Sequence, residues 1–207
     1  MEFIYNKKQK FTEEWFDSMI PSWGKLFTES NFNIKNVLEI GCYEGRATSF
    51  VCEKFLEDGV NYEIVDTFGG TLDESGMSGT AKRLKEDDFI FNNFKHNISF
   101  YPNINFKINR GYSQYILPKL EKEGNKYDFI YVDASHRADD TFVDAYYANK
   151  MLNKNGLIIF DDFGWKDPKE THVVSSPELG VRQFFTMYSD LYKVVINGYQ
   201  IGAIKIK

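Results

Sequence analysis

Short apolar runs alternate with segments of helical pattern through the middle of the chain, and this alternation restricts the fold more than any other feature. Each run has the length of one buried strand. Strands that alternate with helices form a parallel sheet with helices on both faces, so the pattern predicts a doubly wound α/β fold. The predicted strands are Asn36–Ile40, Tyr62–Val65, Asn105–Ile108, Tyr127–Val132 and Leu157–Phe160.

Helices are predicted between these strands. The first begins at Arg46 and is closed by Gly59, which is a helix-stop signal. The last has Val143, Tyr147 and Met151 on one face, as an amphipathic helix would. After the first, the helices are expected at residues 83–97, 113–123 and 139–152.

The two ends of the chain depart from the alternating pattern. Tyr192–Ile196 and Tyr199–Ile206 flank the dipeptide Asn197-Gly198, and Asn-Gly between β-rich runs is a strong hairpin signal. A helix near Glu178–Ser189 precedes them, so the sheet is predicted to end in an antiparallel pair. Residues 1–33 are predicted to form helices before the first strand.

Length and composition narrow the class of protein. A chain of 207 residues fits one domain, 1–207, and the irregular segments 69–81 and 163–179 are predicted to be loops over a site, the second a substrate lid. The formal charge of −5 disfavours a nucleic-acid scaffold. The sequence has neither an apolar stretch of membrane-spanning length nor a signal-peptide core at its start, so we expect a cytoplasmic protein. Cys42 and Cys52 are expected to be free and buried.

Glycines and acids follow the first two predicted strands, where ligands bind in open α/β sheets. The glycines after the first strand allow a tight turn that brings the backbone close to a ligand. Asp66 ends the second strand, where a carboxylate can accept both hydroxyls of a ribose. Tyr43 replaces the middle glycine of the dinucleotide fingerprint, so an adenosine-type ligand is favoured over a dinucleotide. The predicted cofactor-binding residues of this part are Glu39, Gly41, Cys42, Tyr43, Gly45, Asp66 and Thr67.

On these residues the chain resembles the class I S-adenosylmethionine (SAM)-dependent methyltransferases. The turn at 39–45 is similar to their Glu-x-Gly-x-Tyr-x-Gly turn, and the stretches at 111–114, 131–136 and 160–162 resemble segments of the metal-dependent small-molecule O-methyltransferases, such as catechol O-methyltransferase and the macrolide-sugar O-methyltransferases. The resemblance covers about residues 34–163. It implies a Rossmann-like, seven-stranded sheet of order 3-2-1-4-5-7-6 and a transferase that methylates a hydroxyl of a small molecule.

The resemblance also implies roles for individual residues. Gly111, Ser113 and Gln114 would hold the adenine, and Asp133 would contribute to both cofactor binding and catalysis. Asp133, Asp161 and Asp162 end neighbouring strands, so three like charges would repel unless a cation lies among them, and oxygen ligands suit Mg²⁺. His136, three residues after Asp133, would be the general base, because an imidazole accepts a proton near neutral pH.

Two other functions remain open. A nucleic-acid methyltransferase that modifies bases would show an Asn/Asp-Pro-Pro-Tyr/Phe tetrad where this chain has residues 133–136, so this alternative is disfavoured. A SAM-binding module without catalysis is disfavoured by the complete set of acids and histidine. The sequence leaves the acceptor unidentified, and it leaves open whether the chain forms a homo-oligomer.

Overall fold

The structure is a computed structural model that describes residues 3–30, 32–70, 88–166 and 176–207. The predicted loop 69–81 lies mostly outside these ranges. The first residues of the predicted helix 83–97 and the middle of the predicted lid 163–179 also lie outside them.

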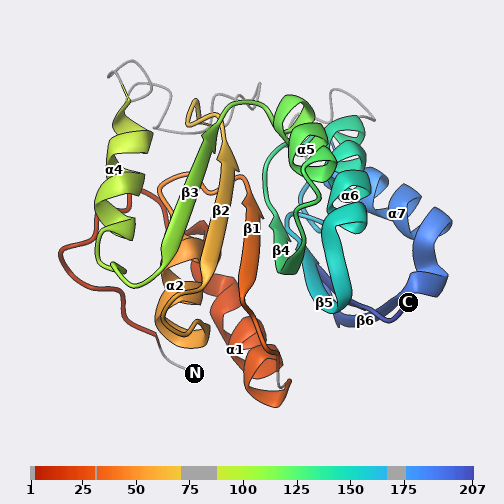
Figure 1. Ribbon diagram of the computed structural model, residues 1–207, viewed down its shortest axis with the longest axis horizontal. Coiled ribbons are helices and arrows are strands. Elements are labelled where there is room, and N and C mark those ends of the chain that lie inside the picture. The colour runs from red at the N-terminus through yellow and green to blue at the C-terminus, as the bar shows by residue number, and fades with distance from the viewer. Residues whose placement is uncertain (1–2, 31, 71–87, 167–175) are drawn as a thin grey trace.

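Within the described residues, seven strands form one mixed sheet of order β3-β2-β1-β4-β5-β7-β6 (Figure 1). β1 to β5 are parallel, β7 is antiparallel to β5, and β6 is antiparallel to β7. This confirms the predicted fold class, strand order and terminal hairpin. The strands are β1 (Asn36–Ile40), β2 (Asn61–Asp66), β3 (Asn105–Arg110), β4 (Tyr127–Val132), β5 (Leu152–Phe160), β6 (Tyr192–Asn197) and β7 (Ile201–Lys205).

Helices cover both faces of the sheet, with α1, α2 and α4 on one face and α5, α6 and α7 on the other (Figure 1). Neighbouring residues of a strand point to opposite faces. Val37 therefore packs on the face covered by α1, α2 and α4, and Leu38 packs on the face covered by α5, α6 and α7. No helix of the described residues is long and apolar enough to span a membrane. The helices are α1 (Ile20–Glu29), α2 (Arg46–Phe55), α4 (Phe89–Ile98), α5 (Ser113–Lys122), α6 (Ala138–Met151) and α7 (Pro177–Tyr188), with short 3₁₀ helices η1 (Trp15–Met19) and η2 (Ser189–Leu191).

β5 begins five residues earlier than predicted. Leu152 follows the end of α6 directly and pairs with Tyr127 of β4. Residues 153–155 are polar and precede Gly156, and Asn155 has a left-handed backbone with φ 65°. A register shift between Tyr127 and Phe129 accommodates this irregularity within the strand pair.

The predicted apolar face of α6 was wrong in part. Met151 is buried, whereas Val143 and Tyr147 are only half-buried. The helix packs against α5, α7 and the sheet at once, so its buried surface is broad and follows another set of positions. The buried residues of α6 are Thr141, Asp144, Ala145, Ala148, Asn149 and Met151.

The predicted helices of the N-terminal segment are confirmed only from Trp15 onward. Residues 3–14 are not helical, and several of their backbone groups bond to side chains of the domain. Asn97 of α4 accepts from the N–H of Lys10 at 2.7 Å and donates to the carbonyl oxygen of Lys10 at 2.7 Å. Arg46 of α2 forms two hydrogen bonds to Asp17, of 2.7 and 2.6 Å, which holds η1 against α2.

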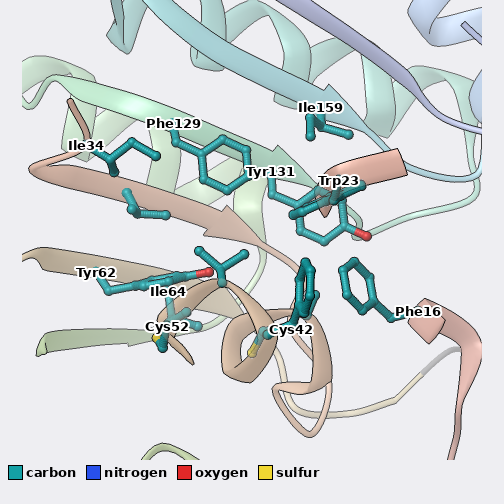
Figure 2. Packing of buried hydrophobic residues seen from close by; sticks show 14 of the residues in the cluster. Phe16, Trp23, Ile34, Cys42, Cys52, Tyr62, Ile64, Phe129, Tyr131 and Ile159 are labelled. Carbon is teal, nitrogen blue, oxygen red and sulfur yellow. The ribbon is translucent and has the colours of Figure 1, made fainter. Parts of the chain in front are cut away.

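The core between the sheet and helices α1, α2 and α4 is dense in aromatic side chains (Figure 2). Trp23 of α1 is fully buried and its ring centroid lies 4.8 Å from that of Tyr131 on β4. The indole N–H of Trp23 donates to Gln200 Oε1 at 2.6 Å, which joins α1 to the C-terminal hairpin. Cys42 and Cys52 are free and buried, as predicted.

Candidate active site

The turn after β1 is packed between the ends of β2 and β4. The N–H of Gly41 donates to the carbonyl oxygen of Val65 at 2.8 Å, and the N–H of Asp133 donates to that of Ile40 at 2.8 Å. Gly41 has φ +82°, and a Cβ at this position would lie 1.9 Å from the carbonyl oxygen of Asp133. Only glycine fits this close approach of two backbones.

The carboxylate of Asp66 binds the turn directly. Its Oδ2 accepts from the N–H groups of Cys42, at 2.6 Å, and Tyr43, at 2.9 Å, while Oδ1 accepts from the N–H of Phe68 at 2.5 Å. A carboxylate has about four lone-pair sites, so about one remains for a ligand. Asp66 thus lies at the predicted place, with room for about one ribose hydroxyl rather than two.

Glu44, inside the turn, ties it to the N-terminal segment. Its Oε2 accepts from the N–H of Thr12 at 2.6 Å and from the Thr12 hydroxyl at 3.0 Å, and its Oε1 accepts from Asn93 at 2.8 Å. The ring of Trp15 lies 5.3 Å from that of Tyr43. Sequence reasoning missed Thr12 and Glu44 because nothing in the pattern connects residues 3–14 to the turn.

Glu39, predicted to bind cofactor, lies in β1 two residues before Gly41 and is fully buried. Its Oε2 accepts from the hydroxyls of Thr48, at 2.7 Å, and Tyr62, at 2.8 Å. Its Oε1 has no hydrogen-bond partner among the described residues. Burial raises the pKa of the Glu39 carboxyl from 4.5 to about 7, against the effect of the two hydroxyls.

The predicted adenine segment follows β3 and lies beside the end of β2. The N–H of Gly111 donates to the carbonyl oxygen of Asp66 at 2.9 Å. Ser113 is buried at the start of α5, and Gln114 Nε2 donates to Asp140 of α6 at 2.6 Å. The structure therefore brings this segment next to Asp66. The remaining predicted cofactor residues are Gly45, with φ +78°, and Thr67, whose hydroxyl accepts from the N–H of Gly69 at 3.1 Å.

Asp133 and Asp161, at the ends of β4 and β5, converge on one hydroxyl. The hydroxyl of Tyr131 lies 3.1 Å from Asp133 Oδ2 and also hydrogen-bonds to Asp161 Oδ2. Burial raises the pKa of the Asp133 carboxyl well above its usual range, and the nearby Asp161 and Asp162 raise it further. Burial, and then Asp162, likewise raise the pKa of Asp161. The pair is thus arranged where two negative charges are costly.

Asp162 is turned away from that pair, with φ 52°. Its Oδ2 lies 2.8 Å from Nε2 of His136, and its Oδ1 accepts from the hydroxyl of Tyr199 at 2.7 Å. The His136 ring lies 4.3 Å from the ring of Trp165. Sequence reasoning brought His136 and Asp162 to one edge but missed Tyr199, which the hairpin returns to the site.

Asp133, His136, Asp161 and Asp162 line one small pocket beyond the ends of β4 and β5. Among the described residues, no three His, Cys, Asp or Glu side chains are grouped so as to hold a metal ion. The carboxylate oxygens of Asp133 and Asp161 are donors of the kind that a hard cation takes, and here they bond to the Tyr131 hydroxyl and, for Asp161 Oδ1, to the N–H of Asp162. Asp162 would have to give up a present bond to join them. The pocket is lined by Val132, Asp133, Ala134, Ser135, His136, Thr141, Asp144, Asp161, Asp162 and Pro177.

The family model of a methyltransferase domain matches residues 38–163 of this chain. The match includes the turn after β1, the end of β2, the predicted adenine segment and the acids after β4 and β5, and it covers more than half of the 207 residues. The chain belongs to this methyltransferase family.

Two relatives have curated names. An uncharacterized protein of Acanthamoeba polyphaga mimivirus is 26% identical over 126 residues, which are 61% of this chain and 50% of that protein. A malonyl-[acyl-carrier protein] O-methyltransferase of Ilyobacter polytropus is 27% identical over 184 residues, which are 86% of this chain and 60% of that protein. This methyltransferase chain thus spans one half to three fifths of the length of these relatives.

Solved methyltransferase structures share the fold at low sequence identity. An O-methyltransferase from Bacillus cereus in complex with S-adenosylhomocysteine (SAH) is 17% identical, with a TM-score of 0.58 over 89% of this chain and 81% of that chain. TomG from Streptomyces achromogenes, in complex with SAM, is 15% identical, with a TM-score of 0.60 over 90% and 80%. MycE, of the mycinamycin pathway, in complex with Mg, SAH and mycinamycin VI, is 14% identical, with a TM-score of 0.57 over 96% and 51%.

Proposed function

We propose that this methyltransferase transfers the methyl group of SAM to a hydroxyl oxygen of a small molecule, with His136 as the general base. The observation that carries the proposal is the His136–Asp162 pair, with 2.8 Å between Nε2 and Oδ2, in the pocket at the end of β4. The solved O-methyltransferases of the same fold, with SAH or SAM bound, support the cofactor and the type of acceptor.

The cofactor would lie across the ends of β1, β2 and β4. Gly41 and Gly45 allow the backbone to approach it, Asp66 offers about one lone-pair site to the ribose, and Ser113 and Gln114 face the adenine side. Methyl transfer is a displacement at the sulfonium carbon, so the protein contributes mainly alignment and a deprotonated nucleophile.

His136 is oriented for proton acceptance by its contact with Asp162. A carboxylate can only accept, so the ring donates Nε2–H to Asp162, and a neutral imidazole then has its lone pair on Nδ1. Nδ1 is the atom that would take the proton of the acceptor hydroxyl. Asp162, held in turn by Tyr199, stabilises the imidazolium that results.

We further propose that a divalent cation, Mg²⁺ first, binds at Asp133 and Asp161, with Asp162 as the predicted third ligand. When bound, such a cation would acidify the acceptor hydroxyl. The two carboxylates that share the Tyr131 hydroxyl support this proposal, as does the Mg in the MycE structure. Excess chelator should abolish turnover but leave the affinity for SAH unchanged, and full activity in chelator would refute the metal requirement.

The chain is proposed to act as one domain, and the middle of the predicted lid 163–179 lies outside the described residues. The test is a methyl-transfer assay with purified protein and methyl-labelled SAM over a panel of phenols, sugars and hydroxylated metabolites, and with DNA and RNA as separate acceptors. Labelled product from at least one small hydroxyl compound, reduced sharply in His136→Ala, is expected. Transfer to nucleic acid alone, or tight SAM binding without turnover on any acceptor, would refute the proposal.

A further inference from the structure

Asp140 of α6 connects the two segments that would meet at the cofactor. Its Oδ1 accepts from Gln114 Nε2 at 2.6 Å, and its Oδ2 accepts from the Ser135 hydroxyl at 2.9 Å. Gln114 lies in the segment after β3, and Ser135 lies between the catalytic Asp133 and His136. One carboxylate therefore holds the start of α5 against the loop that carries the base.

This contact determines which atom Gln114 presents to a ligand. The oxygen and nitrogen of a side-chain amide are distinguished by their hydrogen-bond partners, and a carboxylate carries no proton to donate. The nitrogen of Gln114 must therefore face Asp140, and the carbonyl oxygen Oε1 points away from it. Gln114 consequently presents a hydrogen-bond acceptor on the side opposite Asp140.

A second acid of α6, one turn later, lies beside the neighbouring residue. Asp144 is fully buried, and neither of its carboxylate oxygens has a hydrogen-bond partner among the described residues. Burial raises the pKa of Asp144 to about 7, and the hydroxyl of Ser113 opposes that shift by favouring the charged form. Acids of α6 thus lie beside both Ser113 and Gln114 of the predicted adenine segment.

We propose that Asp140 is a positioning residue that, by fixing the amide of Gln114, makes the site specific for the 6-amino group of adenine. This inference rests on the proposed SAM-dependent function. An exocyclic amino group has N–H donors, one of which matches the acceptor Gln114 Oε1. The 6-oxo group of hypoxanthine is itself an acceptor and would leave this oxygen unpaired, a mismatch that binding sites reject strongly.

The experiment compares the affinities of SAH and S-inosylhomocysteine by calorimetry. Wild type should prefer SAH by roughly tenfold or more, the cost of leaving the acceptor Gln114 Oε1 without a hydrogen bond. In Asp140→Asn the new amide can donate as well as accept, so Gln114 can turn over, and the preference should fall to within about threefold, well under 1 kcal/mol. The matched control is Asp139→Asn, which removes the same charge from an exposed neighbour paired with Arg137 and should retain the wild-type preference.

A double-mutant cycle separates positioning from a general structural effect. If Asp140 acts through Gln114, Asp140→Asn should change the preference in wild type but not in a Gln114→Ala background. The Gln114→Ala variant alone should also lose the preference, which keeps the inference testable if Asp140→Asn does not fold. Full preference in either single variant overturns the inference, and so does equal binding of both compounds to wild type. Absence of binding of either compound to wild type would overturn the proposed function as well.

Discussion

Substitution of the buried Glu39 by glutamine should remove a pH dependence of stability. The carboxyl is fully buried with one oxygen unpartnered, and its pKa is raised from 4.5 to about 7. Because the folded state favours the neutral form, the contribution of Glu39 is fully present below pH 4.5 and is lost as the pH rises through about 7. At about 1.4 kcal/mol per pKa unit, the loss is roughly 3 kcal/mol.

Urea unfolding followed by tryptophan fluorescence between pH 4.5 and about 7 measures this contribution. The free energy of unfolding of wild type minus that of Glu39→Gln should fall by roughly 3 kcal/mol over this range. Asp144 and Asp161 also have raised pKa values, but they are present in both proteins and cancel in the difference. Asp133 cancels only in part, because Glu39 is among the minor causes of its raised pKa. The control is Glu53→Gln, at an exposed position on α2. A difference that is constant to within roughly 0.5 kcal/mol across the range would refute the reasoning.

Three further outcomes are expected. Gly41→Ala should prevent folding or abolish cofactor binding, as circular dichroism and calorimetry would show, because the new Cβ would lie 1.9 Å from a backbone oxygen of Asp133. Asp66→Ala should weaken SAH binding by roughly tenfold or more, since the turn loses its charge-assisted hydrogen bonds, and unchanged affinity would contradict this role. His136→Ala should lower kcat on the order of 10²- to 10⁴-fold with little change in SAH affinity, and wild-type kcat in this variant would exclude His136 as the base.

The fold could be predicted largely because the central strands have local signals. Alternating apolar runs and the Asn-Gly turn indicate the strands by themselves, and the acids at the strand ends follow from the parallel arrangement. The early start of β5 at Leu152 could not be predicted, because residues 153–156 have the composition of a turn. The irregular path of residues 3–14 depends on Asn97, which is distant in sequence.

The candidate site, like the fold, could be predicted only where the signal is local in the sequence. Asp133 and Asp161 could be placed at strand ends from the pattern, but the order that makes these strands neighbours, and the role of His136, came from the family resemblance. The orientation of Asp162 toward His136 could not be predicted, because it depends on its φ of 52° and on Tyr199 returning from the hairpin. Asp144 was missed because the apolar face of α6 was assigned to other positions, although an acid within a buried helix face is itself a signal.

The hydrogen bond between Trp23 and Gln200 joins residues 177 positions apart, so it can form only after almost the whole chain has been synthesised. At roughly 5 to 20 residues per second, the ribosome needs about 10 to 35 s to reach the partner after adding the tryptophan. Over that interval a nascent chain must keep α1 from aggregating, and the edge of β5 is also exposed from its own synthesis until the hairpin follows. Closure of the hairpin onto β5 then completes the support behind Asp161 and Tyr131, so the candidate active site is assembled last. The environment of the Trp23 indole should accordingly report the final step of folding.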